Sequence, residues 1–140
     1  VHVEPSSCNN ATNIDKRMTF AETLLKHMTK GAFVIYYDET NFNLYCKRSQ
    51  GRAKRSERAV VKLPPSKGNN LQLQCAVSTE MGLLHYAKQR GSIRMEVNAA
   101  FVDVVYDAAK AHETYQAYFS GKPVVIVLDN APAHSQTENL

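Results

Sequence analysis

Two short apolar runs, each followed by an aspartate, constrain the fold of this chain more than any other feature. Residues 33–37 (Phe-Val-Ile-Tyr-Tyr) lead into Asp38, and residues 124–128 (Val-Val-Ile-Val-Leu) lead into Asp129. An uninterrupted apolar run of this length is typical of a strand that is buried on both faces. The two runs therefore predict two inner strands of one sheet, each with a carboxylate at its end.

The two aspartates would converge if the strands that carry them lie side by side. A carboxylate at the mouth of a buried strand is costly unless a positive partner meets it. Two convergent carboxylates form a hard oxygen site suited to Mg²⁺ or Mn²⁺, the ions of phosphoryl chemistry. The alternative is that each aspartate only caps a turn at the end of its strand. We predict that Asp38 and Asp129 are metal ligands and catalytic residues.

Size and composition favour one folded domain. The chain has 140 residues, of which 44% are hydrophobic and 21% charged, values typical of a globular protein. No run is long enough to cross a bilayer, and the first residues lack the pattern of a secretory signal. The cysteines are odd in number and form no CxxC pair, so we expect reduced thiols and an intracellular location.

Turn and cap signals divide the chain into elements. Residues 1–17 are polar and without periodicity, so we expect a flexible lead-in, followed by the domain over 18–140. Thr19 and Glu22 fit a capping box, which predicts a helix over 19–30 that Gly31 ends. Alternating or apolar patterns predict strands over 33–38, 41–46, 71–77, 83–87 and 124–128.

A helix is predicted to connect the last two of these strands. Asn98 can cap it, and Phe101, Val105 and Tyr115 share one face at helical spacing. A helix that connects two strands of one sheet almost always makes a parallel crossover. The sequence therefore predicts an α/β fold, a mixed sheet in which an antiparallel meander is followed by a crossover helix and a final strand parallel to the first.

Positive charge is concentrated in one segment. The formal net charge is +4, yet residues 47–67 hold eight Lys and Arg against one acid, Glu57. A localised basic segment is typical of contact with a phosphate backbone, and a solvated loop is the alternative. The candidate DNA-binding residues are Arg52, Lys54, Arg55 and Lys67.

Three polar residues adjoin the two aspartates. Glu39 follows Asp38, but successive strand side chains point to opposite faces, so we expect Glu39 to support the site or the turn rather than share an ion. Asn130 follows Asp129, and His134 is close enough in sequence to return to the mouth of the sheet. A surface histidine is the alternative for His134.

Four segments together resemble the catalytic domain of mariner-like DDE transposases. They are YDETNF at 37–42, GRA at 51–53, KGNN at 67–70 and VLDNAPAH at 127–134. The resemblance covers roughly residues 18–140 and implies an RNase H-like fold in which a metal-bound acidic triad cuts and joins DNA strands. It implies that Asp38 is the first acid and Asp129 the second, with Mg²⁺ or Mn²⁺ as cofactor. The implied partners are DNA and a homodimer mate or transposase subunit, in the nucleus if the source is eukaryotic.

The resemblance also implies a third acid, carried on a helix a few dozen residues beyond the second. The sequence ends at Leu140, and Glu138 lies too close to Asp129 to take that place. We therefore expect a partial domain, incomplete at its C-terminus, with weak or absent strand cleavage and transfer. The alternatives are a non-catalytic remnant that binds DNA or assembles with a transposase, and an unrelated small metal-binding fold.

Overall fold

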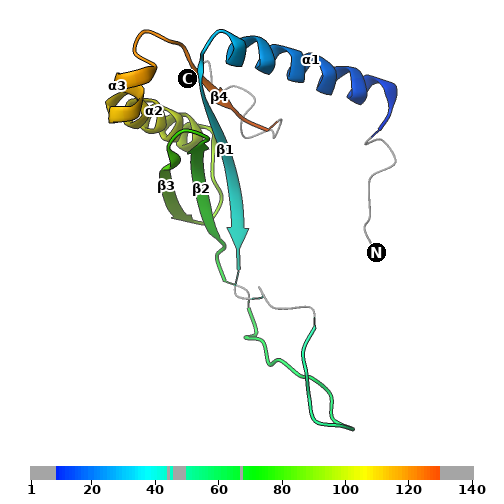
Figure 1. Ribbon diagram of the computed structural model, residues 1–140. Helices are drawn as coiled ribbons and strands as arrows, with labels where there is room; N and C mark the ends of the chain where they lie inside the picture. Colours follow the sequence, from blue (N-terminus) through cyan, green and yellow to red (C-terminus); the bar gives the residue numbers. More distant parts are fainter. Residues whose placement is uncertain (1–8, 44, 46–49, 67, 130–140) are drawn as a thin grey trace.

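The computed structural model describes residues 9–43, 45, 50–66 and 68–129 of the chain (Figure 1). None of the helices in this described part is both long and apolar enough to span a bilayer. In chain order, the elements are α1 (Ala11–Thr29), β1 (Phe33–Phe42), β2 (Leu71–Ser78), β3 (Gly82–Arg90), α2 (Met95–Ala111), α3 (Glu113–Tyr118) and β4 (Val124–Val127).

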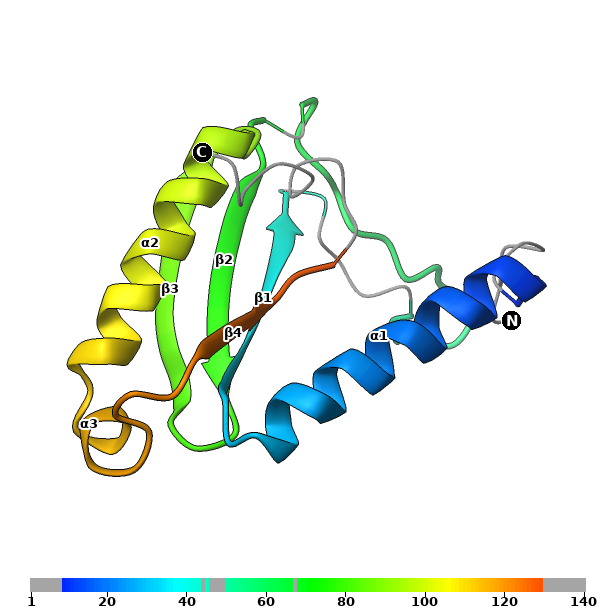
Figure 2. The same cartoon turned by 90° about the horizontal axis from the view of Figure 1, so that it is seen from above.

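The four strands form one mixed sheet in the order β3-β2-β1-β4. β1 pairs with β2 and β2 with β3 in antiparallel fashion, whereas β4 lies parallel to β1. α2 and α3 form the crossover from the meander to β4. Figure 2 shows α2 on the side of β2 and β3, and α1 on the side of β1 and β4. The predicted mixed sheet, with its meander and parallel last strand, is confirmed.

Two strand and helix limits differ from the prediction. The separate strand predicted over 41–46 is wrong at its start, because Asn41 and Phe42 pair with Gln72 and Leu71 and so extend β1 itself. Residues 44 and 46 of that prediction lie outside the described residues. The helix predicted to include Tyr115 is broken at His112, whose backbone is extended and whose Nδ1 accepts the N–H of Thr114 at 3.2 Å. This acceptor starts the separate helix α3.

The first helix begins earlier than predicted. Asn10 is its N-cap and accepts the N–H of Asn13 at 2.8 Å, so residues 11–17 are helical rather than part of a lead-in. Thr19, which we predicted as the cap, lies inside the helix and donates its hydroxyl to the carbonyl of Asp15 at 3.0 Å. α1 ends at Thr29, close to the predicted limit, and Gly31 follows with φ +76°.

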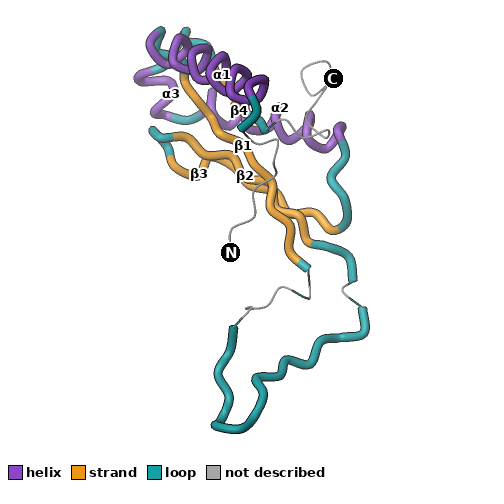
Figure 3. The backbone as a smooth tube through the Cα atoms, turned by 90° about the vertical axis from the view of Figure 1, so that its right-hand side faces the viewer, coloured by secondary structure: helices purple, strands orange, loops and turns teal. Residues whose placement is uncertain are grey.

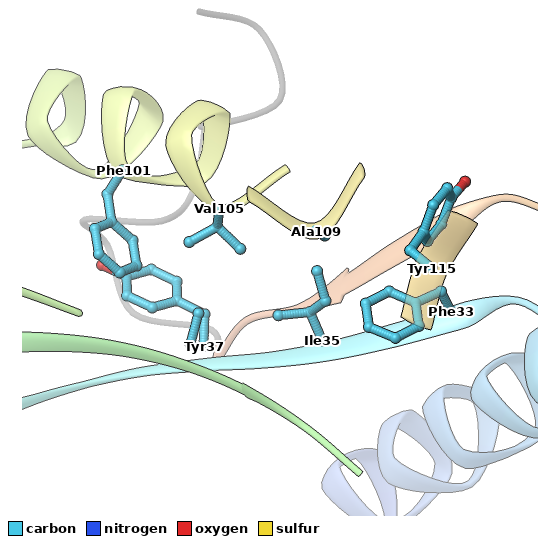
Figure 4. Close-up of a cluster of buried hydrophobic side chains, with 8 residues drawn as sticks. Phe33, Ile35, Tyr37, Phe101, Val105, Ala109 and Tyr115 are labelled. Carbon is cyan, nitrogen blue, oxygen red and sulfur yellow. The ribbon is translucent and has the colours of Figure 1, made fainter. Parts of the chain in front are cut away.

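The core lies between one face of the sheet and helices α2 and α3 (Figure 4). Phe33, Ile35 and Tyr37 point from β1 into this core, where the Tyr37 ring packs on Phe101 at 4.9 Å between centroids. The Phe33 ring meets the edge of Tyr115 at 5.7 Å. Because side chains alternate along a strand, the even-numbered residues of this part of β1 point to the opposite face.

A long loop connects β1 to β2. Its described part, residues 50–66, projects beyond the end of the sheet, well away from the helices (Figure 3). Every described residue in this stretch is exposed. The loop therefore extends the molecule from the end of the sheet toward which β1 runs.

Candidate functional site

The parallel pairing of β1 with β4 sets the candidate site. The last residues in register are Tyr36 and Val127, and the two aspartates each lie two positions further along. β4 ends at Val127, so the register directs the chain toward neighbouring positions for the two aspartates but does not pair them in the ladder. Their convergence and their role as metal ligands stay predictions.

Asp38 lies on the face of the sheet that α2 does not cover. Its side chain is exposed, and its Oδ1 accepts the N–H of Glu39 at 2.8 Å. Asp129 follows β4 and is also exposed. Two accessible carboxylates are donors of the type that Mg²⁺ and Mn²⁺ prefer, so the donor chemistry fits these ions. The described part of the chain contains no group of three or more His, Cys, Asp or Glu side chains that could hold a metal ion.

Glu39 faces the opposite way from Asp38. Its Oε1 lies 2.6 Å from the Tyr37 hydroxyl, which belongs to the core face of β1. The alternation predicted from the sequence is therefore observed, and Glu39 does not share the face of Asp38. A supporting role for Glu39 in a metal site stays a prediction.

A buried polar network beneath Asp38 was missed by the sequence reasoning. The Tyr37 hydroxyl lies 2.7 Å from Asn98 Oδ1, and Gln74 Nε2 donates to both oxygens, at 2.8 and 2.9 Å. Gln74 and Asn98 are among the most deeply buried side chains of the described chain. We predicted Asn98 as a helix cap, but Arg94 holds that position. The available signal was an asparagine on the apolar face of a helix, three residues before Phe101.

The pKa of Tyr37 reflects its burial and the charges around this network. Burial raises the pKa of Tyr37 well above its ordinary value, and the hydrogen bond to Glu39 raises it further. The negative charges of Glu39 and Asp129 act in the same direction, whereas the hydrogen bond from Gln74 lowers this pKa. The charge of Asp129 therefore contributes to the raised pKa of Tyr37.

The described part of the basic segment, residues 50–66, lies in the projecting loop (Figure 1). Arg52, Lys54 and Arg55 are all exposed. The loop follows the C-terminal end of β1, the strand that carries Asp38. These cations are accessible to a large anionic partner, and DNA binding by them stays a prediction. Three further candidates, Lys67, Asn130 and His134, fall outside the described residues.

Comparison with known proteins gives one family and one fold. Residues 33–139 match the family described as DDE superfamily endonuclease. The Mos1 mariner paired end complex with Mn has 19% identity and a TM-score of 0.65, over 96% of this chain and 40% of that one. A pre-cleavage Mos1 transpososome has 17% identity and a TM-score of 0.67, over 96% and 41%. The Mos1 transposase catalytic domain with raltegravir and Mg has 14% identity and a TM-score of 0.59, over 90% and 54%.

These likenesses concern the fold. The mixed four-stranded sheet with its helices matches the catalytic domain of the Mos1 transposase, so the predicted RNase H-like fold class is confirmed. The chain spans about two fifths of the length of the first two structures that it matches. No protein with a curated description matches it.

Proposed function

Because this chain belongs to the DDE superfamily endonuclease family, we propose that it is a transposase-type catalytic domain for metal-dependent cleavage and transfer of DNA strands. The observation that supports the proposal is the parallel register of β1 and β4, whose last pair, Tyr36 and Val127, lies two residues before Asp38 and Asp129. In the proposed reaction, water cleaves a DNA strand to leave a 3′ hydroxyl, and this hydroxyl then attacks a phosphodiester of the target DNA.

Asp38 and Asp129 are the residues that would hold Mg²⁺ or Mn²⁺. Two such ions, held by these carboxylates, would activate the attacking oxygen and stabilise the leaving oxygen of a phosphodiester. The choice of ion is supported by the Mos1 structures, which were determined with Mn and with Mg. The Glu39 N–H orients the Asp38 carboxylate through its 2.8 Å hydrogen bond, and the ladder between β1 and β2 holds the backbone of Asp38 opposite Cys75.

The loop cations supply the proposed contact with DNA. Arg52, Lys54 and Arg55 would hold the phosphodiester backbone, and Lys67 is included because of its position in the sequence. Mos1 transposase is known in a complex with its left transposon end, which supports DNA as the partner class. Action on DNA also supports an intracellular location, nuclear if the source is eukaryotic.

A second candidate function is DNA binding or assembly without catalysis. It is favoured by the donor count, because Asp38 and Asp129 are joined by no third metal-binding side chain among the described residues. Two carboxylates leave a divalent ion with few protein ligands. In this case the chain would bind DNA, or pair with a second copy or a transposase subunit, and leave the strands intact.

Incubation with supercoiled plasmid and Mn²⁺ separates the two functions. We expect slow nicking by the 140-residue chain, and we expect Asp38→Ala and Asp129→Ala to abolish it. Asp103→Ala is the control, since Asp103 is an exposed carboxylate on α2. Metal-independent retention of DNA with no nicking would support the second function, and nicking that survives both aspartate substitutions would contradict the first.

A further inference from the structure

The buried network beneath Asp38 joins three elements through side chains alone. Tyr37 comes from β1, Gln74 from the middle of β2 and Asn98 from the first turn of α2. Their three mutual contacts lie between 2.7 and 2.9 Å, within the range of well-formed hydrogen bonds. Glu39 adds a fourth contact, 2.6 Å from the Tyr37 hydroxyl.

Asn98 is an amide on an otherwise apolar helix face. It lies in the first turn of α2, where Arg94 and not Asn98 is the N-cap. Asn98 is 0% exposed, on the helix face that carries Phe101 and Val105. An apolar residue there would avoid burying an amide. Polar residues that break local patterns in this way are most often kept at functional sites.

The network holds both sequence neighbours of Asp38. Gln74 donates to the Tyr37 hydroxyl, which can donate its one proton to Asn98 or to Glu39, and Glu39 lies opposite Gln74 in the ladder. Since Asp38 lies between two residues that are held on the core face, its own side chain is directed to the other face.

We propose that Asn98 and Gln74 are positioning residues that hold Tyr37 and Glu39 on the core face and thereby fix the direction of the Asp38 carboxylate. This positioning role rests on the proposed function, in which Asp38 binds the metal. A carboxylate fixed in direction loses less freedom when it binds an ion. Residues that orient a metal ligand in this way strengthen metal binding without touching the ion.

Hydrogen exchange tests the constraint without metal. In EDTA, Asn98→Ala is expected to raise the exchange rates of the Asp38 and Glu39 amides about tenfold relative to those of residues 33–35. Tyr37→Phe is the second variant, because it removes only the hydroxyl and keeps the ring against Phe101. Val105→Ala is the control, since Val105 lies in the same core and appears in no side-chain hydrogen bond of the network. Circular dichroism establishes that each variant is folded.

Manganese titration tests the consequence. The variants Asn98→Ala and Tyr37→Phe are expected to weaken Mn²⁺ binding about tenfold, whereas Val105→Ala leaves it unchanged even if it lowers the Tm equally. Unchanged exchange at residues 38 and 39 overturns the proposal, as does unchanged Mn²⁺ affinity in a chain that binds the ion. If the unsubstituted chain binds no Mn²⁺ but the local exchange rises as expected, the proposed function fails while the constraint on Asp38 stands.

Discussion

Tyr37 belongs both to the hydrophobic core and to the polar network next to Asp38. Its ring packs in the core against Phe101, while its hydroxyl contacts Glu39, Gln74 and Asn98. The hydroxyl carries one proton, so it can donate to Glu39 or to Asn98 but not to both at once. Deprotonating it would place a negative charge beside Glu39 in a buried position, which explains the direction of its pKa shift.

The raised pKa of Tyr37 predicts a loss of stability at alkaline pH. The ordinary tyrosine pKa is 10.0, and the folded state raises it, so only the unfolded chain releases this proton as the pH passes that value. The stabilisation is complete below pH about 9 and declines above pH about 10 by up to about 1.4 kcal/mol per pH unit. Denaturant unfolding at several pH values measures this decline.

Two tyrosine variants separate this effect from general alkaline unfolding. Tyr37→Phe is expected to flatten the decline in unfolding free energy above pH about 10, since it removes the buried hydroxyl. Tyr118→Phe is the matched control, because the Tyr118 side chain is 78% exposed. An equal alkaline decline in the Tyr37→Phe variant and the unsubstituted chain would contradict the assignment.

Sequence periodicity predicted the single residues of the site unevenly. Asp38 and Asp129 were proposed as site residues because each follows an apolar run, and Glu39 was assigned to the other face by alternation. Gln74 and Asn98 were not identified, because their importance depends on contacts between elements far apart in the sequence. A buried asparagine and a helix-capping asparagine look alike until the partner strand is known.

At the level of elements, strand pairing sets limits of strands that the local sequence pattern could not predict. The strands near 71–77, 83–87 and 124–128 were predicted because each is bounded by Gly, Asn or Pro. The error at 41–46 arose because alternation cannot distinguish a new strand from the continuation of β1, which β2 extends to Phe42. The early start of α1 was missed because its first turns are polar and its cap is Asn10.

The end of α1 gives a stability prediction at this level. Gly31 has φ +76°, its N–H donates to the Met28 carbonyl at 2.9 Å, and the N–H of Ala32 donates to the His27 carbonyl at 3.1 Å. This pair of bonds is a Schellman motif, which needs a left-handed residue. Gly31→Ala is expected to lower the free energy of unfolding by about 1–2 kcal/mol.

Gly51→Ala is the matched control for that substitution. Gly51 is not among the residues of positive φ, and an added Cβ would only touch the Ala59 side chain at 3.5 Å. Its substitution is expected to change stability by less than about 0.5 kcal/mol. Chemical denaturation measures both values, and equal effects of the two substitutions would show that the turn after α1 does not require glycine.

For the molecule as a whole, the charge distribution predicts how DNA binding depends on salt. If Arg52, Lys54 and Arg55 contact phosphates, replacing all three with alanine removes about three units from the slope of log affinity against log salt concentration. The control replaces three exposed lysines outside the loop: Lys30 at the C-cap of α1, Lys110 in the last turn of α2 and Lys122 before β4. Fluorescence anisotropy in EDTA measures each slope, and equal slopes for the two triple variants would exclude the loop as the DNA contact.

The central claim is that Asp38 and Asp129 bind one divalent site although they lie far apart in the sequence. Titration of the chain with Mn²⁺, followed by electron paramagnetic resonance of the free ion, tests it most directly. We expect Asp38→Asn and Asp129→Asn each to weaken binding at least about tenfold, and the double variant to weaken it little further, because one site is lost only once. Asp103→Asn should bind as the unsubstituted chain does. Equal Mn²⁺ affinity in the unsubstituted chain and both single variants would contradict the account.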